Sequence, residues 1–539
     1  MFRFFRITIS LIYLSFFLVF NSAHASLNAD PLEEKWVYRT VEQLVAFGLL
    51  DHAILFQQPL SWKAIQKYAE EAQQNLSRVE GTIIEPRVRL LLLELKRQIP
   101  NDPPEKKIKM DPVRSVEAGY LFLDSPDRSV PQSRASSHQI TARINPLVAD
   151  RGGRPFVDGQ NFSLETSHAL YWEPYFSIVG QPQVFLQKNA NGNDRFDANY
   201  DKLYLRSELK NVGIQFGRDR LLFGPGGQKG SVFSGNARGI DMFKISNVSP
   251  YRLPWILKYL GFLDTTFFFG VLENSREFPH AYVTGYVLSF LPHKNFQLSF
   301  TATSMSGGEG SPPASLGSRI FDPFFGYMIN SVSGANPSDD FASNRLGAFD
   351  FKWRIPSWRG AEIYYGFTLD DLNTQYRFFH ESFQRVGIYL PRLSNDGIES
   401  LRLEYNHAGV LPYRHAQFVS GWTRYNELMG DSLGPDSQAV HLTYDYSSNP
   451  AWEHMLAFSW EQRDSDDYVI SGNDPIRRIA DNPTETRTRG RFALNRHLKG
   501  NFWVCAQLGL EWVDTFNFQP GSDFMNFLSD VRLTWRLPQ

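Results

Sequence analysis

Two stretches of the chain concentrate side chains that can hold a sugar. Aromatic rings pack against the C–H faces of sugars, and planar polar groups bind the hydroxyls. Residues of these types gather near positions 218–241 and 422–436, and we take nine of them as candidate polysaccharide-binding residues: Arg218, Arg220, Asn236, Arg238, Asp241, Trp422, Arg424, Tyr425 and Asp436. Buried loop packing uses the same residue types, so these side chains are equally suited to holding loops together.

A glycine-rich segment, GPGGQKGS at positions 224–231, lies inside the first stretch. A phosphate-binding loop requires a glycine at the position that Lys229 occupies here, followed by lysine and then by serine or threonine. No strand–loop–helix pattern surrounds the segment either, which excludes nucleotide binding of this kind. Its glycines let the backbone take tight or left-handed conformations. We interpret the segment as a structural or sugar-contacting loop.

Motifs of catalysis and metal binding are missing from the sequence. It contains no HExxH, no Gly-x-Ser-x-Gly and no cluster of cysteine and histidine, and its 12 histidines are scattered. The polar run at positions 189–201 indicates a hairpin turn rather than a cation-binding loop, because the closing glutamate of such a loop is absent. We expect a binding protein with no catalytic residue, metal or cofactor. A serine–histidine pair assembled only by the fold stays an alternative.

Apolar and polar residues alternate along most of the chain after Asp111. The alternation is clearest in five segments, each with one apolar and one charged face: positions 203–210, 401–406, 440–446, 504–512 and 531–537. A soluble β-sandwich turns the charged face to water, whereas a transmembrane barrel turns the apolar face to lipid and the charged face to its lumen. Strand lengths of about 9–11 residues, aromatic residues at strand ends, and long loops alternating with tight turns favour the barrel. We predict an all-β transmembrane barrel of about 16–18 antiparallel strands, closed so that no edge is left unpaired.

The tight turn at Lys210-Asn211 predicts the orientation of this barrel, because short turns face the periplasm and long loops face outward. The strand that follows then runs outward and places the loop Arg220–Arg238 on the external side. Eight charged residues are expected on the inner faces of the strands: Arg206, Glu208, Arg402, Glu404, Asp445, Glu511, Arg532 and Arg536. We expect them to pair across strands and fill a closed lumen; the alternative is that they line an open channel.

The first 25 residues have the organisation of a secretory signal peptide. Arg3 and Arg6 precede an apolar stretch at positions 7–20, and Ala23-His24-Ala25 is a small-x-small cleavage site. We expect cleavage after Ala25. The single cysteine, Cys505, leaves an exported chain without an internal disulfide. The formal net charge of −2 offers no basic field for nucleic acid.

Residues 26–110 have a helical rather than a strand-like pattern. Apolar residues recur at helical spacing within positions 31–47, and Gly48 follows where a left-handed helix end is expected. Ser61 is a good N-cap for a second helix, and Pro86 stands at the head of a third. The sequence therefore predicts a small helical domain whose amphipathic faces dock against another part of the protein.

Several short segments also carry a family resemblance: FGPG at Phe223–Gly226, Ser234–Ala237, Gly239–Asp241, Ile245–Asn247, the LPW…LKYLG run ending at Gly261, and Tyr413–Asp436. They resemble the signature regions of the Wzi-type capsule-assembly proteins of the bacterial outer membrane. The resemblance implies an 18-stranded barrel with a periplasmic helical bundle at its N-terminus, which would plug the barrel. It also implies a lectin that tethers capsular polysaccharide to the cell surface.

These observations divide the chain into three expected parts. Residues 1–25 are the signal peptide, residues 26–110 the periplasmic helical domain, and residues 111–539 the outer-membrane barrel with long external loops. We expect a lectin-like protein of a Gram-negative outer membrane that binds capsular or other surface polysaccharide and supports its assembly or attachment. Its expected partners are that polysaccharide, outer-membrane lipid and the barrel-assembly machinery, and not nucleic acid. The alternatives are a porin or translocation channel, and a barrel enzyme acting on lipid or glycan.

Overall fold

The fold is that of a computed structural model, which describes most of the chain after the predicted signal peptide. The described residues are 29, 34–100, 108–132, 137–172, 175–226, 230–312, 315–333, 343–370, 378–449, 451–470, 476–498 and 501–537. The signal peptide predicted at positions 1–25 and the Gly-Gln-Lys at positions 227–229 lie outside the described residues.

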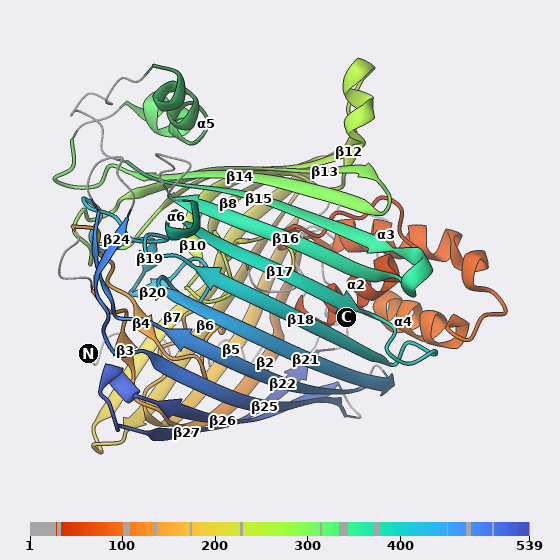
Figure 1. Cartoon of the computed structure of the whole chain (residues 1–539). Helices are drawn as coiled ribbons and strands as arrows, with labels where there is room; N and C mark the ends of the chain where they lie inside the picture. The colour runs from red at the N-terminus through yellow and green to blue at the C-terminus, as the bar shows by residue number, and fades with distance from the viewer. Residues whose placement is uncertain are drawn as a thin grey trace.

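Within this part of the chain, eighteen antiparallel strands close into a barrel (Figure 1). They are β2 (Ile108–Asp124), β5 (Gly159–Trp172), β6 (Phe176–Asn189), β7 (Asp194–Leu209), β8 (Val212–Asp219), β10 (Ile240–Asn247), β12 (Phe262–Val271), β13 (Tyr282–His293), β14 (Phe296–Ser306), β15 (Ser343–Ile355), β16 (Ala361–Asp370), β17 (Ser382–Leu390), β18 (Glu399–Ala408), β21 (Ser437–Asn449), β22 (Trp452–Arg463), β25 (Glu485–His497), β26 (Phe502–Asp514) and β27 (Phe524–Arg536). The first strand pairs with the last, from Ser115 opposite Arg536 to Asp124 opposite Phe527. The ring therefore has no open edge, and the predicted fold class is confirmed at the upper end of its strand count.

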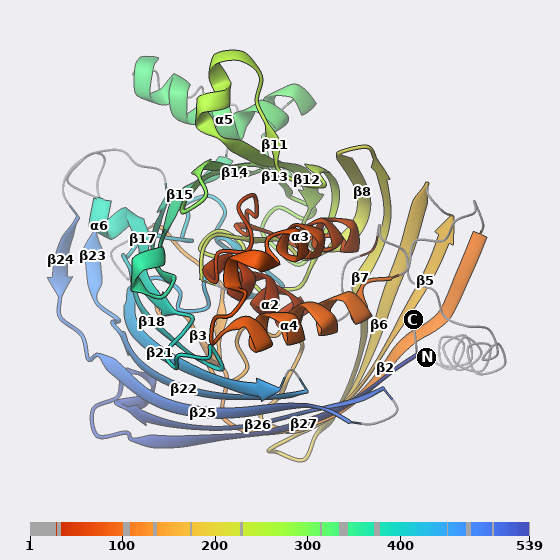
Figure 2. The same ribbon diagram turned by 90° about the vertical axis from the view of Figure 1, so that its right-hand side faces the viewer.

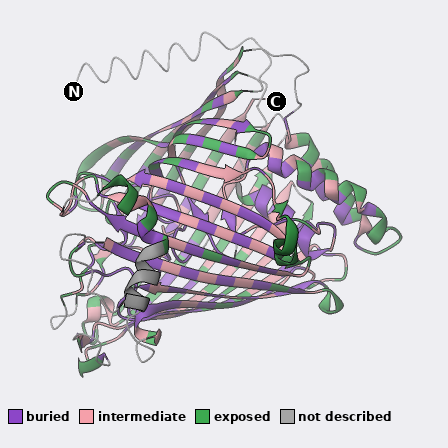
Figure 3. Ribbon diagram, turned by 90° about the horizontal axis from the view of Figure 1, so that it is seen from above, coloured by how far each residue is buried: buried purple, intermediate pink, exposed green. Residues whose placement is uncertain are grey.

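The two faces of the wall differ as the alternating sequence predicted (Figure 3). On β26, the outward Leu510 is 56% exposed, whereas the next residue, Glu511, is 0% exposed because it points into the lumen. Aromatic residues on the outside pack against one another across strands: ring centroids lie 4.9 Å apart for Phe267 and Tyr286, and 5.0 Å apart for Phe300 and Phe349. An outer face of this kind suits hydrocarbon.

Helices occupy the segment before the barrel, as predicted. α2 (Glu34–Ala46), α3 (Trp62–Gln74) and α4 (Glu85–Gln98) share a buried apolar core. The Ser61 hydroxyl accepts from the Ala64 amide at 3.4 Å and caps α3, and Pro86 lies in the first turn of α4. No helix in the described ranges is both long and apolar enough to cross a membrane.

The remaining elements belong mostly to loops and are short, apart from the 18-residue α5. The helical ones are η1 (Leu76–Val79), η2 (Trp255–Leu260), α5 (Leu316–Ser333), η3 (Pro356–Trp358), α6 (Phe378–Glu381) and η5 (Phe516–Phe518). The short strands are β1 (Gln57–Gln58), β3 (Arg128–Ser129), β4 (Arg143–Ile144), β9 (Leu222–Phe223), β11 (Tyr251–Arg252), β19 (Thr423–Arg424), β20 (Glu427–Leu428), β23 (Asp467–Val469) and β24 (Arg477–Ala480).

The three N-terminal helices lie across one end of the barrel (Figure 2). Ion pairs tie α2 to the inner wall. Arg39 lies 3.3 Å from Asp445 and 3.4 Å from Glu453, and Glu42 lies 2.8 Å from Arg402. The predicted docking of an amphipathic helical segment thus takes place on the charged inner face of the barrel.

Three loops from the opposite end of the barrel fold back into the lumen. Their described residues lie within positions 125–158, 220–239 and 409–436, and each loop contributes buried apolar residues, such as Ile140, Val232 and Tyr413, to one cluster with inner wall residues. Within it, Phe233 packs against Trp422 with ring centroids 5.6 Å apart, which joins the second loop to the third.

The second of these loops meets the helical segment inside the barrel. Strand β1 pairs with β9 as a two-stranded antiparallel sheet, with Gln57 opposite Phe223 and Gln58 opposite Leu222. The amide of Gly224 donates to the carbonyl of Phe56 at 2.9 Å. The lumen is therefore filled from both ends by elements that touch each other.

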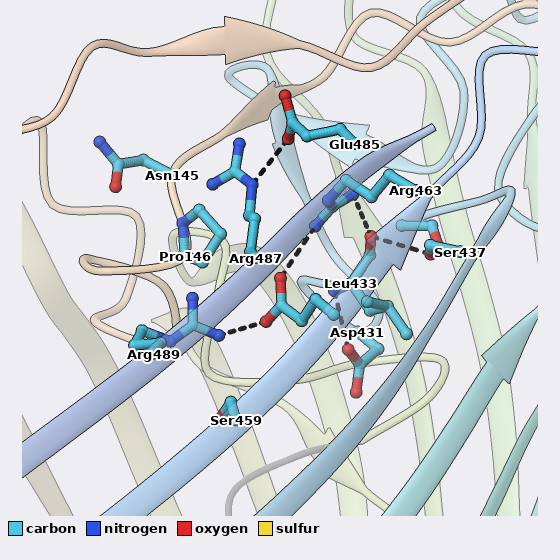
Figure 4. A network of polar contacts seen from close by, with 12 residues as sticks. Asn145, Pro146, Asp431, Leu433, Ser437, Ser459, Arg463, Glu485, Arg487 and Arg489 are labelled. Carbon is cyan, nitrogen blue, oxygen red and sulfur yellow. Dashed lines mark hydrogen bonds and ion pairs between the residues drawn. The ribbon is translucent and has the colours of Figure 1, made fainter. Parts of the chain in front are cut away.

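Inward charges form the network that the alternating pattern predicted (Figure 4). On β25, Arg489 donates to Glu511 at 2.9 Å and also binds Glu461. Arg463 of β22 donates to the carbonyl of Leu433, which links the wall to the third loop. Inward charges thus pair with one another and with the inserted loops.

A cavity of about 280 Å³ remains inside the barrel, between α2, the inserted loops and the wall. Charged and polar residues dominate its lining, including Lys35, Arg151, Glu165, Asp201 and Arg532. An open channel would require a continuous path through the lumen, and the helices and loops that surround this cavity stand in that path.

We expect the intact protein to be nearly silent in planar-bilayer conductance, because helices and loops fill its lumen. The double substitution Arg39→Gln/Glu42→Gln should produce flickering current steps. It removes the two α2 charges that pair with Asp445, Glu453 and Arg402, a loss of about 3 kcal/mol for one such buried pair, and so loosens α2.

The matched control is Glu85→Gln/Arg89→Gln, which removes a 2.6 Å ion pair within the exposed side of α4. This variant should stay silent. A steady open-pore current from the unaltered protein, or equal currents from both double variants, would contradict a lumen closed by the docking of α2.

Candidate functional site

A hairpin of the third loop crosses the mouth of the barrel and reaches its rim near β10 and β12, where it contacts Asp241 and Glu273. It consists of β19 and β20, joined by Tyr425 and Asn426, whose φ values are +50° and +63°. Two consecutive residues with positive φ are characteristic of a type I′ turn, which matches the twist of a two-residue hairpin. The amide of Tyr425 donates to Glu273 at 3.0 Å, and the carbonyl of Asn426 accepts from the Arg143 amide at 2.7 Å.

A buried arginine holds the base of this hairpin. The Arg276 side chain is 0% exposed and lies 3.8 Å from the Glu273 carboxylate. It donates to the carbonyl of Thr423 at 3.1 Å and to that of Gly421 at 3.3 Å. These charge-assisted hydrogen bonds position the turn without using its side chains.

Asp241 is the centre of the charged group at the hairpin tip. Arg218 binds its two carboxylate oxygens with donor–acceptor distances of 2.8 and 2.7 Å. Arg424 donates to the same carboxylate at 3.1 Å. The Arg424 side chain is only 1% exposed, whereas that of Asp241 is 49% exposed. The carboxylate is thus held rigidly on its protein side and open to solvent on the other.

The Tyr425 ring lies beside this group and is 39% exposed. The guanidinium of Arg238 sits 5.1 Å from the ring centroid, and that of Arg424 sits 5.6 Å from it. Cations near an aromatic face orient the ring and restrict its motion. Five of the nine predicted residues are thus brought together, and we call them the rim cluster: Arg218, Arg238, Asp241, Arg424 and Tyr425.

The other four predicted residues lie elsewhere and hold the loops. Trp422 is fully buried, and its indole N–H donates to the carbonyl of Val232 at 2.9 Å. The Asn236 side chain donates to the carbonyl of Leu428 at 3.0 Å. Arg220 binds Asp201 at 2.6 Å and lines the cavity in the lumen.

Asp436 lies at the junction between the third loop and the loop that follows β22. Its amide donates to the carbonyl of Gly409 at 2.8 Å, and its carbonyl accepts from the Asp464 amide at 3.0 Å. Burial raises the pKa of Asp436 to about 7, although Arg414 counteracts this effect. Its contacts are those of a loop-holding residue.

Sequence reasoning did not select the residues that hold the hairpin in place: Arg143, Glu273, Arg276 and Glu427. Arg143 donates to Glu427 at 3.0 Å across 284 positions of sequence. Glu273 and Tyr425 are 152 positions apart. No local spacing marks such residues, because the contacts arise only when the third loop crosses the barrel mouth.

His415 joins the first and third loops. Its backbone pairs with Gln139, and its Nδ1 accepts from the amides of Gln417 at 3.1 Å and Phe418 at 3.0 Å. Burial, with the nearby His138 and Arg345, lowers the pKa of His415 to about 4. The ring is therefore neutral at pH 7, as an Nδ1 acceptor must be.

A serine–histidine pair does occur, as the enzyme alternative requires. His441 Nδ1 lies 2.9 Å from Ser459 Oγ, where β21 faces β22. The pair lies on the inner face, with His441 8% exposed, and neither residue lines the 280 Å³ cavity. No group of three or more histidine, cysteine or acidic residues in the described chain could hold a metal ion.

The closed wall, the filled lumen and the rim cluster define a class of protein: a plugged transmembrane β-barrel. Residues 128–526 match the family model of the capsule assembly protein Wzi. The chain belongs to this family, as its signature segments suggested.

Solved structures show a similar fold. A structure of Wzi from Escherichia coli, described as an outer membrane protein involved in group 1 capsule assembly and a carbohydrate-binding β-barrel, is 16% identical. The match covers 95% of this chain and 99% of that one, with a TM-score of 0.64. The outer membrane protein OprD from Pseudomonas aeruginosa matches at 9% identity over 79% of this chain and 94% of that one, with a TM-score of 0.41. No curated protein sequence matches the chain.

Replacing Asp241 should loosen the hairpin. Asp241→Asn removes the charge that pairs with Arg218 and with the buried Arg424, a loss of about 2 kcal/mol for a charge-assisted hydrogen bond. Amide hydrogen exchange at positions 423–428 should then be about thirtyfold faster. Asp481→Asn is the control. That carboxylate is 80% exposed beside Arg478, so its replacement should leave hydrogen exchange at positions 423–428 unchanged. Unchanged exchange in Asp241→Asn would show that the rim cluster does not hold the hairpin.

Acid should separate the first loop from the third. The pKa of His415 in the folded protein, about 4, is below the ordinary value of 6.5, so its contribution to stability is complete above pH 6.5 and is lost as the pH falls towards 4. Hydrogen exchange at positions 415–418, corrected for its intrinsic pH dependence, should accelerate over this range. His415→Asn keeps an acceptor oxygen that does not titrate and should flatten the response; an equal response in both proteins would contradict this role.

Proposed function

We propose that this protein resides in the outer membrane and binds capsular or other surface polysaccharide at the external mouth of its barrel. Binding supports the assembly or attachment of the polymer and involves no chemical conversion of it. The observation that carries the proposal is the rim cluster in a member of the Wzi family: an exposed tyrosine ring and an exposed carboxylate, both held by arginines.

The rim cluster has the chemistry that a sugar requires. The Tyr425 ring offers an apolar face for the C–H side of a pyranose. Asp241 can accept hydrogen bonds from vicinal hydroxyls, and Arg218 and Arg238 can donate to ring oxygens or to sugar carboxylates. Because these groups are already fixed to each other, little side-chain entropy is lost on binding.

The organisation of the lumen favours attachment over transport. Helices fill the lumen from one end and loops fill it from the other, and the two meet where β1 pairs with β9. We infer that the helical segment faces the periplasm and that the polymer stays outside. The apolar wall contacts outer-membrane lipid, and the barrel-assembly machinery inserts it.

The test is retention of native surface polysaccharide by the purified protein. Tyr425→Ala removes the exposed ring and should weaken binding about two- to tenfold, since an aromatic contact contributes roughly 0.5–1.5 kcal/mol. Binding is measured for the unaltered protein and for each variant, immobilised in detergent micelles. The polymer is the surface polysaccharide of the cells that produce this protein.

Tyr175→Ala is the matched control, because this tyrosine is 41% exposed beside Trp172, between β5 and β6 at the other end of the barrel. It should bind as the unaltered protein does. Failure of the unaltered protein to retain any native polysaccharide would remove the proposed function. Unchanged polysaccharide binding by Tyr425→Ala would show that the binding site does not include the Tyr425 ring of the rim cluster.

A further inference from the structure

A short apolar helix projects from the wall at the end of the barrel that carries α2–α4. This helix, η2, is the lime-coloured coil beside the β12 label in Figure 1. Trp255 is 86% exposed, Tyr259 76% and Ile256 62%, and both leucines of the helix are also exposed. None of its six residues is buried. A water-exposed element of this composition would be unfavourable, because five large apolar side chains would lie in solvent.

The base of this projection is built into the fold. The Asn211 side chain accepts from the amide of Ser249 at 3.0 Å and donates to its carbonyl at 2.9 Å. Lys67 of α3 donates to the Ser249 hydroxyl at 2.9 Å. Strand β11 pairs with the start of β12, placing Tyr251 opposite Leu263.

The other end of the projection is fixed by a glycine. Gly261 has φ +79°, and a Cβ at this position would lie 1.8 Å from the carbonyl oxygen of Leu291 on β13. Only glycine allows the chain to turn from η2 into β12 so close to its neighbour. The exposed residues are thus presented by a fixed support on both sides.

The position of η2 indicates what covers it. The helix follows β10, leads into β12 and contacts β13, whose Phe290 packs against the exposed Phe300 of β14 on the outer wall. The apolar surface of the wall therefore continues into η2 at the level where the strands end. Tryptophan and tyrosine are enriched at this boundary of membrane proteins, where an apolar ring contacts lipid and its polar edge stays hydrated.

The charges of the segment indicate the kind of lipid. Between Ser249 and Gly261 the only charged residues are Arg252 and Lys258, and both are basic. The Lys258 ammonium lies 5.4 Å from the centroid of the Tyr259 ring, so a basic group and an aromatic face are presented together. Basic residues at a membrane surface favour anionic headgroups.

We propose that residues 251–260 form a membrane-interface anchor that binds the headgroup region of the leaflet at the helical end of the barrel, with a preference for anionic phospholipid. The anchor lies on one side of the barrel, so it sets both the depth and the tilt of the wall in the bilayer. This role is independent of polysaccharide binding.

The test places a fluorophore on η2 in lipid vesicles. In a Cys505→Ser background, Ile256→Cys is labelled with an environment-sensitive dye, and the full-length protein is reconstituted in phosphatidylglycerol-containing vesicles. We expect blue-shifted emission, quenching by lipids brominated near the headgroup and protection from aqueous iodide.

The matched control is Ile83→Cys, because Ile83 is 60% exposed in the helical segment, in the turn between η1 and α4. Its label should respond to iodide and not to brominated lipid. Equal iodide quenching at both positions would overturn the anchor. A protected label at position 256 without quenching by brominated lipid would also overturn it and would indicate contact with another protein or a second copy.

A second arm tests the headgroup preference. Replacing phosphatidylglycerol with a zwitterionic lipid of the same chain length should reduce the quenching by brominated lipid at position 256. Arg252→Gln/Lys258→Gln should abolish the difference between the two lipids. Equal quenching in both lipids for the parent protein would overturn the anionic preference.

Discussion

Backbone hydrogen bonding in hydrocarbon is the constraint on which the rest of this structure depends. Lipid offers no partner for an unpaired amide, so the strands must form a ring. The pairing of β2 with β27 completes that ring and brings the two ends of the barrel sequence together. Once it is closed, every strand has a lipid-facing and a lumen-facing side, and each inward charge must find a partner inside.

The interior meets that demand with inserted elements as well as with wall residues. Arg39 and Glu42 of α2 bind charges on the wall, and Arg463 on the wall binds the third loop. The inserted helices and loops therefore provide hydrogen-bond and ion-pair partners for inward charges that an empty barrel would leave without them. The loops that close the lumen also carry the hairpin that reaches the rim, so one packing arrangement both seals the barrel and presents Tyr425.

Sequence reasoning could predict the wall because its signal is local and repeated. The alternation that puts Leu510 outside and Glu511 inside is visible in any strand read alone. The site was less predictable, because burial in a loop depends on distant partners. Trp422 and Tyr425 are three residues apart and chemically similar, yet one is buried against Phe233 and the other is exposed beside Arg238. Nothing in the local sequence distinguishes them.

The two-residue sheet between β1 and β9 has a mechanical consequence. Gln57 and Gln58 belong to the segment that carries the helices, whereas Leu222 and Phe223 belong to a loop that enters from the opposite mouth. A displacement of either partner must carry the other with it or break the pairing. The two mouths of the barrel are thereby connected by a direct linkage that runs through the lumen.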